Sequence, residues 1–229
     1  MGGLGKKGEK FMYHYLDDKE FLHKMRALSG DIMQMLCHYL KEDYDIGANF
    51  YLVGSGARNL ILQNGSNPVD LDYNLEIVRC EDFEDCRHLR ECTRKTFNKC
   101  LQEYGLRDCD DSTTPLTSKV IYLKGANNTG FSIDVCITVR DTKDNYYRLI
   151  HEKTGWVSDD KYYWNMAPQS KKLKKKVDFI KECGKWELVR KQYLNIKNKY
   201  LSQNESKSHP SFVCYIEAVN HVYNSRNHW

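Results

Sequence analysis

The strongest constraint on this chain comes from aspartates that stand inside apolar, strand-like segments. Asp70 and Asp72 lie in the run Val69-Asp-Leu-Asp-Tyr-Asn-Leu75, and Asp134 lies in Phe131-Ser-Ile-Asp-Val-Cys-Ile137. A sheet buries such runs, and an inward-facing carboxylate loses hydration that only a nearby positive group replaces. Several carboxylates converging on one point therefore indicate a bound cation.

The spacing of these aspartates indicates what the site would hold. Residues two apart on a strand share a face and lie about 6.6 Å apart, and a neighbouring strand lies about 4.8 Å away. If the strand of Asp134 lies beside that of Asp70 and Asp72, the carboxylates can ring one or two Mg²⁺ ions about 3.5 to 4 Å apart, as used for in-line displacement at phosphorus. Mg²⁺ keeps waters and takes further ligands from substrate phosphates, so the pattern predicts a nucleotide.

A glycine-rich turn upstream can form the phosphate-binding side of such a site. The apolar run 50–53 breaks into Gly54-Ser55-Gly56-Ala57-Arg58 and continues at 59–62, which predicts a strand, a tight turn and a short helix. Glycines let the backbone approach a ligand, and free N–H groups at the helix start, with the Ser55 hydroxyl, can hold a triphosphate. Taken singly, the turn also fits an ordinary strand–helix corner, and the acidic strand also fits a half-exposed strand with its charges in water.

The order and spacing of these parts resemble the signature of the DNA polymerase beta-like nucleotidyltransferase superfamily. The Gly54-Ser55 turn is followed after 15 positions by Asp70-x-Asp72, and then by a lone aspartate in a later apolar strand, over about residues 46–140. The chain departs from the superfamily pattern after Ser55, at Gly56-Ala57-Arg58, where many members have an aromatic or another small polar residue.

The resemblance implies a role for each candidate residue. In that superfamily the Gly-Ser turn binds the terminal phosphates of the incoming nucleotide. The first two carboxylates bind both metals, and the third positions the metal that activates the acceptor hydroxyl. The implied phosphate-binding residues are Gly54, Ser55 and Arg58, and the implied metal-binding and catalytic residues are Asp70, Asp72 and Asp134.

The implied activity is that of a stand-alone, bacterial-type nucleotidyltransferase. It would move a nucleoside monophosphate from a nucleoside triphosphate to an acceptor hydroxyl and release pyrophosphate. We expect Mg²⁺ as the metal, with Mn²⁺ as an alternative, and ATP as the nucleotide. The acceptor stays open among a small molecule, a protein, a nucleotide and RNA, and so does the oligomeric state.

Two other classes of function remain open. One is a catalytically idle nucleotide-binding or interaction module on the same fold, although the presence of all three acidic positions counts against it. The other is a nucleic-acid-binding protein that uses the lysine run Ser170-Lys-Lys-Leu-Lys-Lys-Lys176. Lys171 and Lys172 of this run can instead contact a triphosphate, and the run also fits a solvated helix face.

The periodicity of the apolar residues and the positions of the turn-forming residues predict an α+β (mixed α/β) fold. We expect a small mixed sheet of three to five strands, with helices packed on one face, and a helical C-terminal region. A long helix over 18–41 has Asp17 or Asp18 as its cap, and a charged helix over about 82–104 ends at Gly105. The predicted strands are 50–53, 69–78, 119–124 and 130–139, and the predicted C-terminal helices are 170–183, 186–203 and 210–225.

These elements predict three parts of the chain. Residues 1–15 form a flexible leader, 16–140 a nucleotidyltransferase catalytic core, and 141–229 an aromatic-rich connection followed by the helical region. With 229 residues, of which 41% are hydrophobic, the chain can bury a sizeable core.

Composition also bears on location. A mean hydropathy of −0.70 and the lack of a long apolar run argue against a membrane span. The first ten residues have no apolar segment typical of a secretory signal. Nine cysteines without a Cys-x-x-Cys pair fit a reducing compartment, so we expect a cytoplasmic protein.

Overall fold

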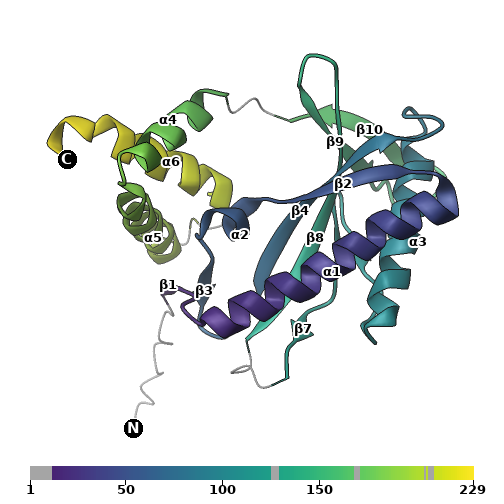
Figure 1. Ribbon diagram of the computed structural model, residues 1–229, viewed down its shortest axis with the longest axis horizontal. Coiled ribbons are helices and arrows are strands. Elements are labelled where there is room, and N and C mark those ends of the chain that lie inside the picture. Colours follow the sequence, from purple (N-terminus) through teal and green to yellow (C-terminus); the bar gives the residue numbers. More distant parts are fainter. Residues whose placement is uncertain (1–11, 125–128, 168–170, 204, 206–208) are drawn as a thin grey trace, which may run out of the picture. The chain divides into compact units, whose positions relative to one another are not determined.

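The computed structural model describes residues 12–124, 129–167, 171–203, 205 and 209–229 (Figure 1). The chain divides into two compact units. We call one the sheet unit, which comprises Asp17–Ile61 and Pro68–Gln169. The other is the helical unit, which comprises Met1–Leu16, Leu62–Asn67 and Ser170–Trp229.

A mixed sheet forms the centre of the sheet unit. Its strands in chain order are β2 (Gly47–Leu52), β4 (Val69–Arg79), β5 (Asp110–Asp111), β6 (Pro115–Thr117), β7 (Ile121–Tyr122), β8 (Gly130–Arg140), β9 (Tyr146–Glu152) and β10 (Lys161–Met166). The main path runs β10-β9-β8-β4-β2, with β4 and β8 parallel and the other neighbours antiparallel. β8 also pairs with β6 and β7, and β6 pairs with β5. The α+β class is as predicted, but the sheet is larger than the predicted three to five strands.

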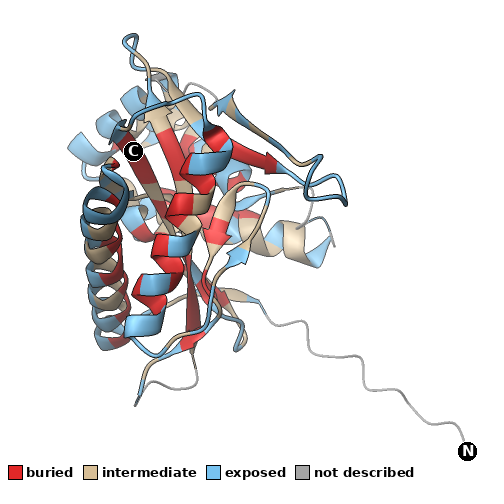
Figure 2. Ribbon diagram, turned by 90° about the vertical axis from the view of Figure 1, so that its right-hand side faces the viewer, coloured by how far each residue is buried: buried red, intermediate tan, exposed pale blue. Residues whose placement is uncertain are grey.

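Two helices cover one face of this sheet. Helix α1 (Lys19–Tyr44) begins after Asp18, whose carboxylate accepts a hydrogen bond from the backbone N–H of Phe21 at 2.9 Å. Helix α3 (Cys86–Glu103) begins after Asp85 in the same way. Phe21 of α1 meets Phe131 of β8 edge to face, with ring centroids 6.2 Å apart. Buried positions gather where helices face strands, and the outer sides of the helices are exposed (Figure 2).

Alternation along β4 and β8 separates a packed face from an open one. Leu71, Tyr73 and Leu75 of β4 are at most 3% exposed, and so are Ile133 and Val135 of β8. These residues point to the helices, because successive side chains on a strand point to opposite faces. The aspartates at the intervening positions therefore lie on the open face.

The structure differs from the prediction between residues 141 and 166, where we expected an aromatic-rich connection. This segment forms the antiparallel strands β9 and β10 of the same sheet. The Asp141 carboxylate accepts hydrogen bonds from the backbone N–H groups of Lys143 and Asn145 at 2.8 and 2.9 Å, which closes the turn into β9. The tyrosines of this segment favour strands. The sheet unit accordingly continues to Gln169, beyond the boundary expected at residue 140.

The helical unit contains α4 (Lys171–Glu182), α5 (Trp186–Ser202), α6 (Ser211–Asn224) and a short 3₁₀ helix (Arg226–His228). The three predicted C-terminal helices are thus confirmed to within two residues at each end. Strands β1 (Tyr13–Tyr15) and β3 (Leu62–Asn64) pair antiparallel in this unit. Of the predicted leader, residues 1–11 lie outside the described residues, and Tyr13–Tyr15 forms β1. The predicted Gly/Asn turn at 125–128 also lies outside them.

Across the residues that the structure describes, no helix is both long enough and apolar enough to span a membrane.

A buried arginine ties α3 to the β5–β6 hairpin. The Arg90 side chain is 0% exposed. Its Nε donates to Asp111 Oδ1 at 3.0 Å, and its two Nη groups donate to the carbonyls of Ser112, Thr114 and Pro115 at 2.6, 2.7 and 3.1 Å. A buried charge is tolerated only when paired and hydrogen-bonded, and this guanidinium meets both conditions.

We predict that Arg90→Met lowers the free energy of unfolding by about 3 to 5 kcal/mol, because Asp111 Oδ1 and the carbonyls of Ser112, Thr114 and Pro115 lose the hydrogen bonds that the buried guanidinium donates. Urea denaturation measures this loss. Arg79→Met is the control, because Arg79 and Asp45 form an exposed ion pair and such pairs contribute at most about 1 kcal/mol. Equal losses in the two variants would contradict the assignment.

Candidate active site

Strands β4 and β8 bring the three predicted aspartates together on the open face of the sheet. In their parallel register, Asp72 lies opposite Asp134, and Asp70 lies opposite Ser132. The Ser132 hydroxyl donates to Asp70 Oδ1 at 2.6 Å. The expectation that the strand of Asp134 lies directly beside the strand of Asp70 and Asp72 is therefore confirmed.

Helix α2 (Gly54–Arg58) lies against Asp72. The backbone N–H of Val53 donates to the carbonyl of Asp72 at 2.8 Å, which ties the end of β2 to β4. Gly54 has φ +63°, and a Cβ added there would lie 2.0 Å from Asp72 Oδ2. Arg58 Nη1 donates to the carbonyl of Gly54 at 2.6 Å, so the guanidinium is held at the same turn. Glycine is needed at position 54 both for the left-handed backbone and for the close approach of the carboxylate.

Two of the carboxylates have raised pKa values because they are partly buried near other negative charges. Burial raises the pKa of Asp72, and the Asp70 charge adds to this, while Arg58 and Arg148 act in the opposite direction. Burial raises the pKa of Asp134 to about 6; the Thr117 hydroxyl opposes the shift, and the charges of Asp70 and Asp72 add to it. Loss of hydration is thus the main cost of the charged carboxylates, and their mutual repulsion adds to it.

The donor set fits a hard divalent cation. Carboxylate oxygens are the ligands that Mg²⁺ prefers. Asp134 Oδ1 is buried and has no hydrogen-bond partner among the described residues, so one oxygen is available as a ligand. Within the described ranges, however, no group of three or more His, Cys, Asp or Glu side chains is placed so that it could hold a metal ion, so Asp70, Asp72 and Asp134 do not form a ready metal site by themselves. Mg²⁺ retains waters and binds substrate phosphates, so a nucleotide would have to supply further ligands.

Two residues beside the carboxylates were not among the predicted site residues. Thr117 of β6 lies opposite Asp134 in the antiparallel pairing of β6 with β8. Arg148 of β9 pairs with Thr138 of β8, and its charge lowers the pKa of Asp72. The sequence offered no signal for either, because Thr117 lies outside the predicted strands and Arg148 lies in the segment that was expected to be an aromatic-rich connection.

Lys171 and Lys172, the remaining predicted contacts, belong to the helical unit at the start of α4. Their role in binding phosphate stays a prediction.

No protein-family model matches this sequence, and no curated protein matches it. Solved structures do match. One is CdnC from Escherichia coli MS115-1 with ATP, at 16% identity and TM-score 0.53, covering 93% of this chain and 62% of that chain. Another is the Bradyrhizobium diazoefficiens CD-NTase CdnG in complex with GTP, at 13% identity and TM-score 0.53, covering 86% of this chain and 65% of that chain.

A third match is the Vibrio cholerae DncV cyclic AMP-GMP synthase in complex with the linear intermediate 5′ pppA(3′,5′)pG, at 12% identity and TM-score 0.62, covering 94% of this chain and 70% of that chain. The chain therefore has a fold similar to that of these solved structures, as the resemblance to the DNA polymerase beta-like nucleotidyltransferase superfamily predicted. One of these structural neighbours, CdnG, is described as a CD-NTase. The chain spans less than two thirds of the length of the CdnC and CdnG structures.

We predict that Gly54→Ala destabilises the protein more than Gly105→Ala. Both glycines have positive φ, +63° and +68°, so both substitutions carry a similar backbone strain of about 1 to 2 kcal/mol. Only at Gly54 does the new methyl group meet a side chain, because nothing lies within 4 Å of a Cβ at Gly105. Chemical denaturation measures the difference, and equal losses would contradict the close approach of Asp72.

We also predict that Asp134→Asn stabilises the metal-free protein at neutral pH. The pKa of Asp134 is about 6 in the folded chain against 3.8 ordinarily, so the folded state binds more protons between these values and loses stability as pH rises through them. An uncharged asparagine removes this loss, which we set on the order of 1 kcal/mol because the group is only partly buried.

Thermal unfolding from pH 4 to pH 7.5 tests this. The gain should be present at pH 7.5 and absent at pH 4. Asp31→Asn, at an exposed position of α1, is the control and should not change the pH profile. A profile of Asp134→Asn that parallels the wild type would contradict the raised pKa.

Proposed function

We propose that this chain is a metal-dependent nucleotidyltransferase that moves a nucleoside monophosphate from a nucleoside triphosphate to an acceptor hydroxyl and releases pyrophosphate. The observation that carries the proposal is the register that sets Asp72 opposite Asp134, with the Gly54 turn against the Asp72 carboxylate. Fold alone does not specify function, so the function is inferred from the geometry of this site. The structural neighbours solved with ATP or GTP support a nucleotide ligand.

The turn at Gly54–Arg58 is the proposed phosphate-binding element. Gly54 has no Cβ, which lets the Asp72 carboxylate lie directly against the backbone of the turn. The Ser55 hydroxyl can donate a hydrogen bond, and the Arg58 guanidinium, held at the turn through the Gly54 carbonyl, supplies positive charge. Lys171 and Lys172 are proposed as further contacts to the triphosphate.

Asp70, Asp72 and Asp134 are the proposed ligands of one or two divalent ions, with Mg²⁺ expected and Mn²⁺ as an alternative. Such an ion, when bound, neutralises phosphate charge and lowers the pKa of the acceptor hydroxyl. The Ser132 hydroxyl orients Asp70. Asp134 is also the candidate proton acceptor for the acceptor hydroxyl.

A nucleotide is the acceptor that we favour among the open alternatives. One structural neighbour is a cyclic AMP-GMP synthase holding a linear intermediate of two nucleotides. The remaining alternative is a catalytically idle module on the same fold. Such a module has no need for three carboxylates in one place, where burial and mutual repulsion disfavour their charged forms.

The proposal predicts Mg²⁺-dependent pyrophosphate release from at least one nucleoside triphosphate. The full chain is incubated with each of the four triphosphates, singly and in pairs, and the products are identified by mass spectrometry. Replacing Asp70 and Asp72 together by alanine should lower turnover by more than about 100-fold, because both proposed metal contacts of β4 are lost. Asp31→Asn, far along α1, should keep wild-type turnover.

Equal turnover in the double variant and the wild type would overturn the assignment of the carboxylates. Binding of a nucleotide by the wild type without any turnover would instead support the idle module.

A further inference from the structure

Helix α2 ends in a way that leaves one backbone carbonyl without a helical partner. It has five residues, and Asn59, which follows it, has φ +57°. The left-handed backbone at Asn59 turns the chain, and the Leu60 N–H donates to the Ser55 carbonyl at 3.0 Å. In a continuing helix this N–H would bind the Gly56 carbonyl. The Gly56 carbonyl therefore needs a partner from outside the helix.

That partner is Arg26 of α1, 30 residues earlier in the chain. Its Nη2 donates to the Gly56 carbonyl at 3.0 Å and to Asn59 Oδ1 at 3.2 Å. Arg58 also binds a carbonyl of α2, that of Gly54, but Arg58 belongs to α2 itself. Arg26 thus ties the end of α2 to another helix.

The part of α1 that carries Arg26 is itself fixed on the sheet. Met25 and Ser29 are 0% exposed. The Ser29 hydroxyl lies 2.8 Å from the Tyr73 hydroxyl of β4, and Tyr73 directly follows Asp72. Residues three apart on a helix are neighbours on its surface, so Arg26 lies beside this contact. Arg26 therefore reaches α2 from a point of α1 that is joined to the strand of the carboxylates.

Helix α2 packs closely on the same strand. Gly56 is buried, and a Cβ added there would lie 2.8 Å from Leu71 Cδ2. Leu71 stands between Asp70 and Asp72, and the Asp72 carboxylate lies against Gly54. A helix of five residues is not stable alone in water, so such contacts decide where the turn lies. A bond that holds α2 on β4 therefore also sets the turn relative to the carboxylates.

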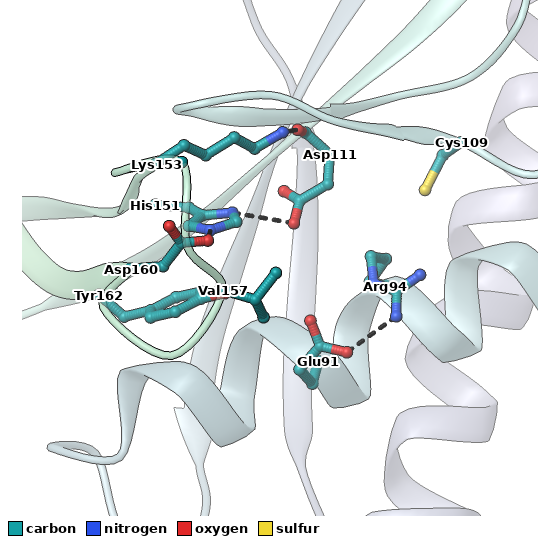
Figure 3. A pocket seen from close by; sticks show the side chains of 10 residues that line it. Glu91, Arg94, Cys109, Asp111, His151, Lys153, Val157, Asp160 and Tyr162 are labelled. Atoms are coloured by element: carbon teal, nitrogen blue, oxygen red, sulfur yellow. Dashed lines mark hydrogen bonds and ion pairs between the residues drawn. The ribbon is translucent and has the colours of Figure 1, made fainter.

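A second short element of the sheet unit is fixed by the same kind of contact. Strands β5 and β6 have two and three residues, and Arg90 of α3 binds backbone carbonyls of their hairpin. This hairpin borders a cavity of about 400 Å³, where Asp111 Oδ2 lies 2.9 Å from His151 Nδ1 (Figure 3). Strands this short need further contacts to be stable. In both places an arginine of a covering helix binds the carbonyls of an element that is too short to hold its own position.

We propose that Arg26 is a positioning residue that holds the turn of residues 54–58 in place for phosphate binding. Its consequence for nucleotide binding rests on the proposed function, but its effect on the turn does not. A binding element that is ordered before the ligand arrives avoids the free-energy cost of ordering during binding. Without Arg26 that cost falls on the binding step, and the chemical step is unchanged.

The test compares Arg26→Met and Arg26→Gln with the wild type. Both side chains are too short to reach the Gly56 carbonyl, both are good helix formers, and one is apolar and the other polar. Arg26 Nε is buried and has no partner among the described residues, so both changes also remove an unpaired donor and should change global stability little. Lys24→Met is the matched control, because Lys24 lies on the same helix and forms an exposed ion pair with Glu20 at 2.6 Å. Thermal unfolding verifies that each variant is folded.

The first readout is amide hydrogen exchange of the nucleotide-free protein, measured by NMR. We expect the Asn59 and Leu60 amides to exchange about 10-fold faster in both Arg26 variants, because local opening no longer breaks a hydrogen bond from a charged donor. The Leu36 amide, in the buried middle of α1, should keep its wild-type rate, and Lys24→Met should match the wild type throughout. Wild-type exchange at Asn59 and Leu60 in a folded Arg26 variant, or equal acceleration at Leu36, would overturn the proposal.

The second readout is steady-state turnover with the active nucleotide. Both Arg26 variants should raise KM for the nucleotide by about 10-fold and leave kcat within about threefold, because the lost ordering affects ground state and transition state alike. A merely structural role would lower kcat through loss of folded protein and leave KM unchanged. That result, or wild-type KM in both variants, would overturn the proposal. If exchange at the turn rises as expected but the wild type turns over no nucleotide, only the proposed function fails.

Discussion

The parallel pairing of β4 with β8 is the constraint on which the rest of the site depends. It sets Asp72 opposite Asp134 on a face that the helices leave open, so two carboxylates meet at the spacing of neighbouring strands. Their burial and mutual repulsion disfavour the charged forms, which the raised pKa values of both residues record. The neighbouring groups reduce this cost only in part: Ser132 donates one hydrogen bond to Asp70, and Arg58 and Arg148 contribute charge from a distance.

The packed face of the same sheet supplies the stability that makes this arrangement tolerable. Apolar residues alternate with the aspartates on both central strands and pack under α1 and α3. Arg90 adds to this stability, because its hydrogen bonds fix the β5–β6 hairpin, which strand pairing alone does not hold. A site that retains unneutralised charge on a well-packed scaffold is typical of proteins that sacrifice stability for binding or catalysis.

Much of this organisation could be predicted from the sequence, because long elements carry strong periodic signals. The 26 residues of α1 and the 11 residues of β4 repeat their patterns several times, and Asp70 and Asp72 share a face by alternation alone. Strands β5 and β6 are too short to show any period. Arg90 holds their hairpin in place and lies 21 to 25 residues before the groups that it binds. No local sequence pattern therefore indicates the hairpin. Thr117 was missed for that reason, and Arg148 because the tyrosines around it were interpreted as a connection.

The central claim is that Asp70, Asp72 and Asp134 share a divalent ion beside the Gly54 turn. Crystals of the full chain grown with Mn²⁺ and a non-hydrolysable nucleoside triphosphate analogue, measured for manganese anomalous scattering, test it most directly. The account predicts an anomalous peak about 2.1 Å from carboxylate oxygens of these aspartates, with the triphosphate over residues 54–58. An ion bound elsewhere, or a nucleotide bound without any ion at the carboxylates, would contradict it.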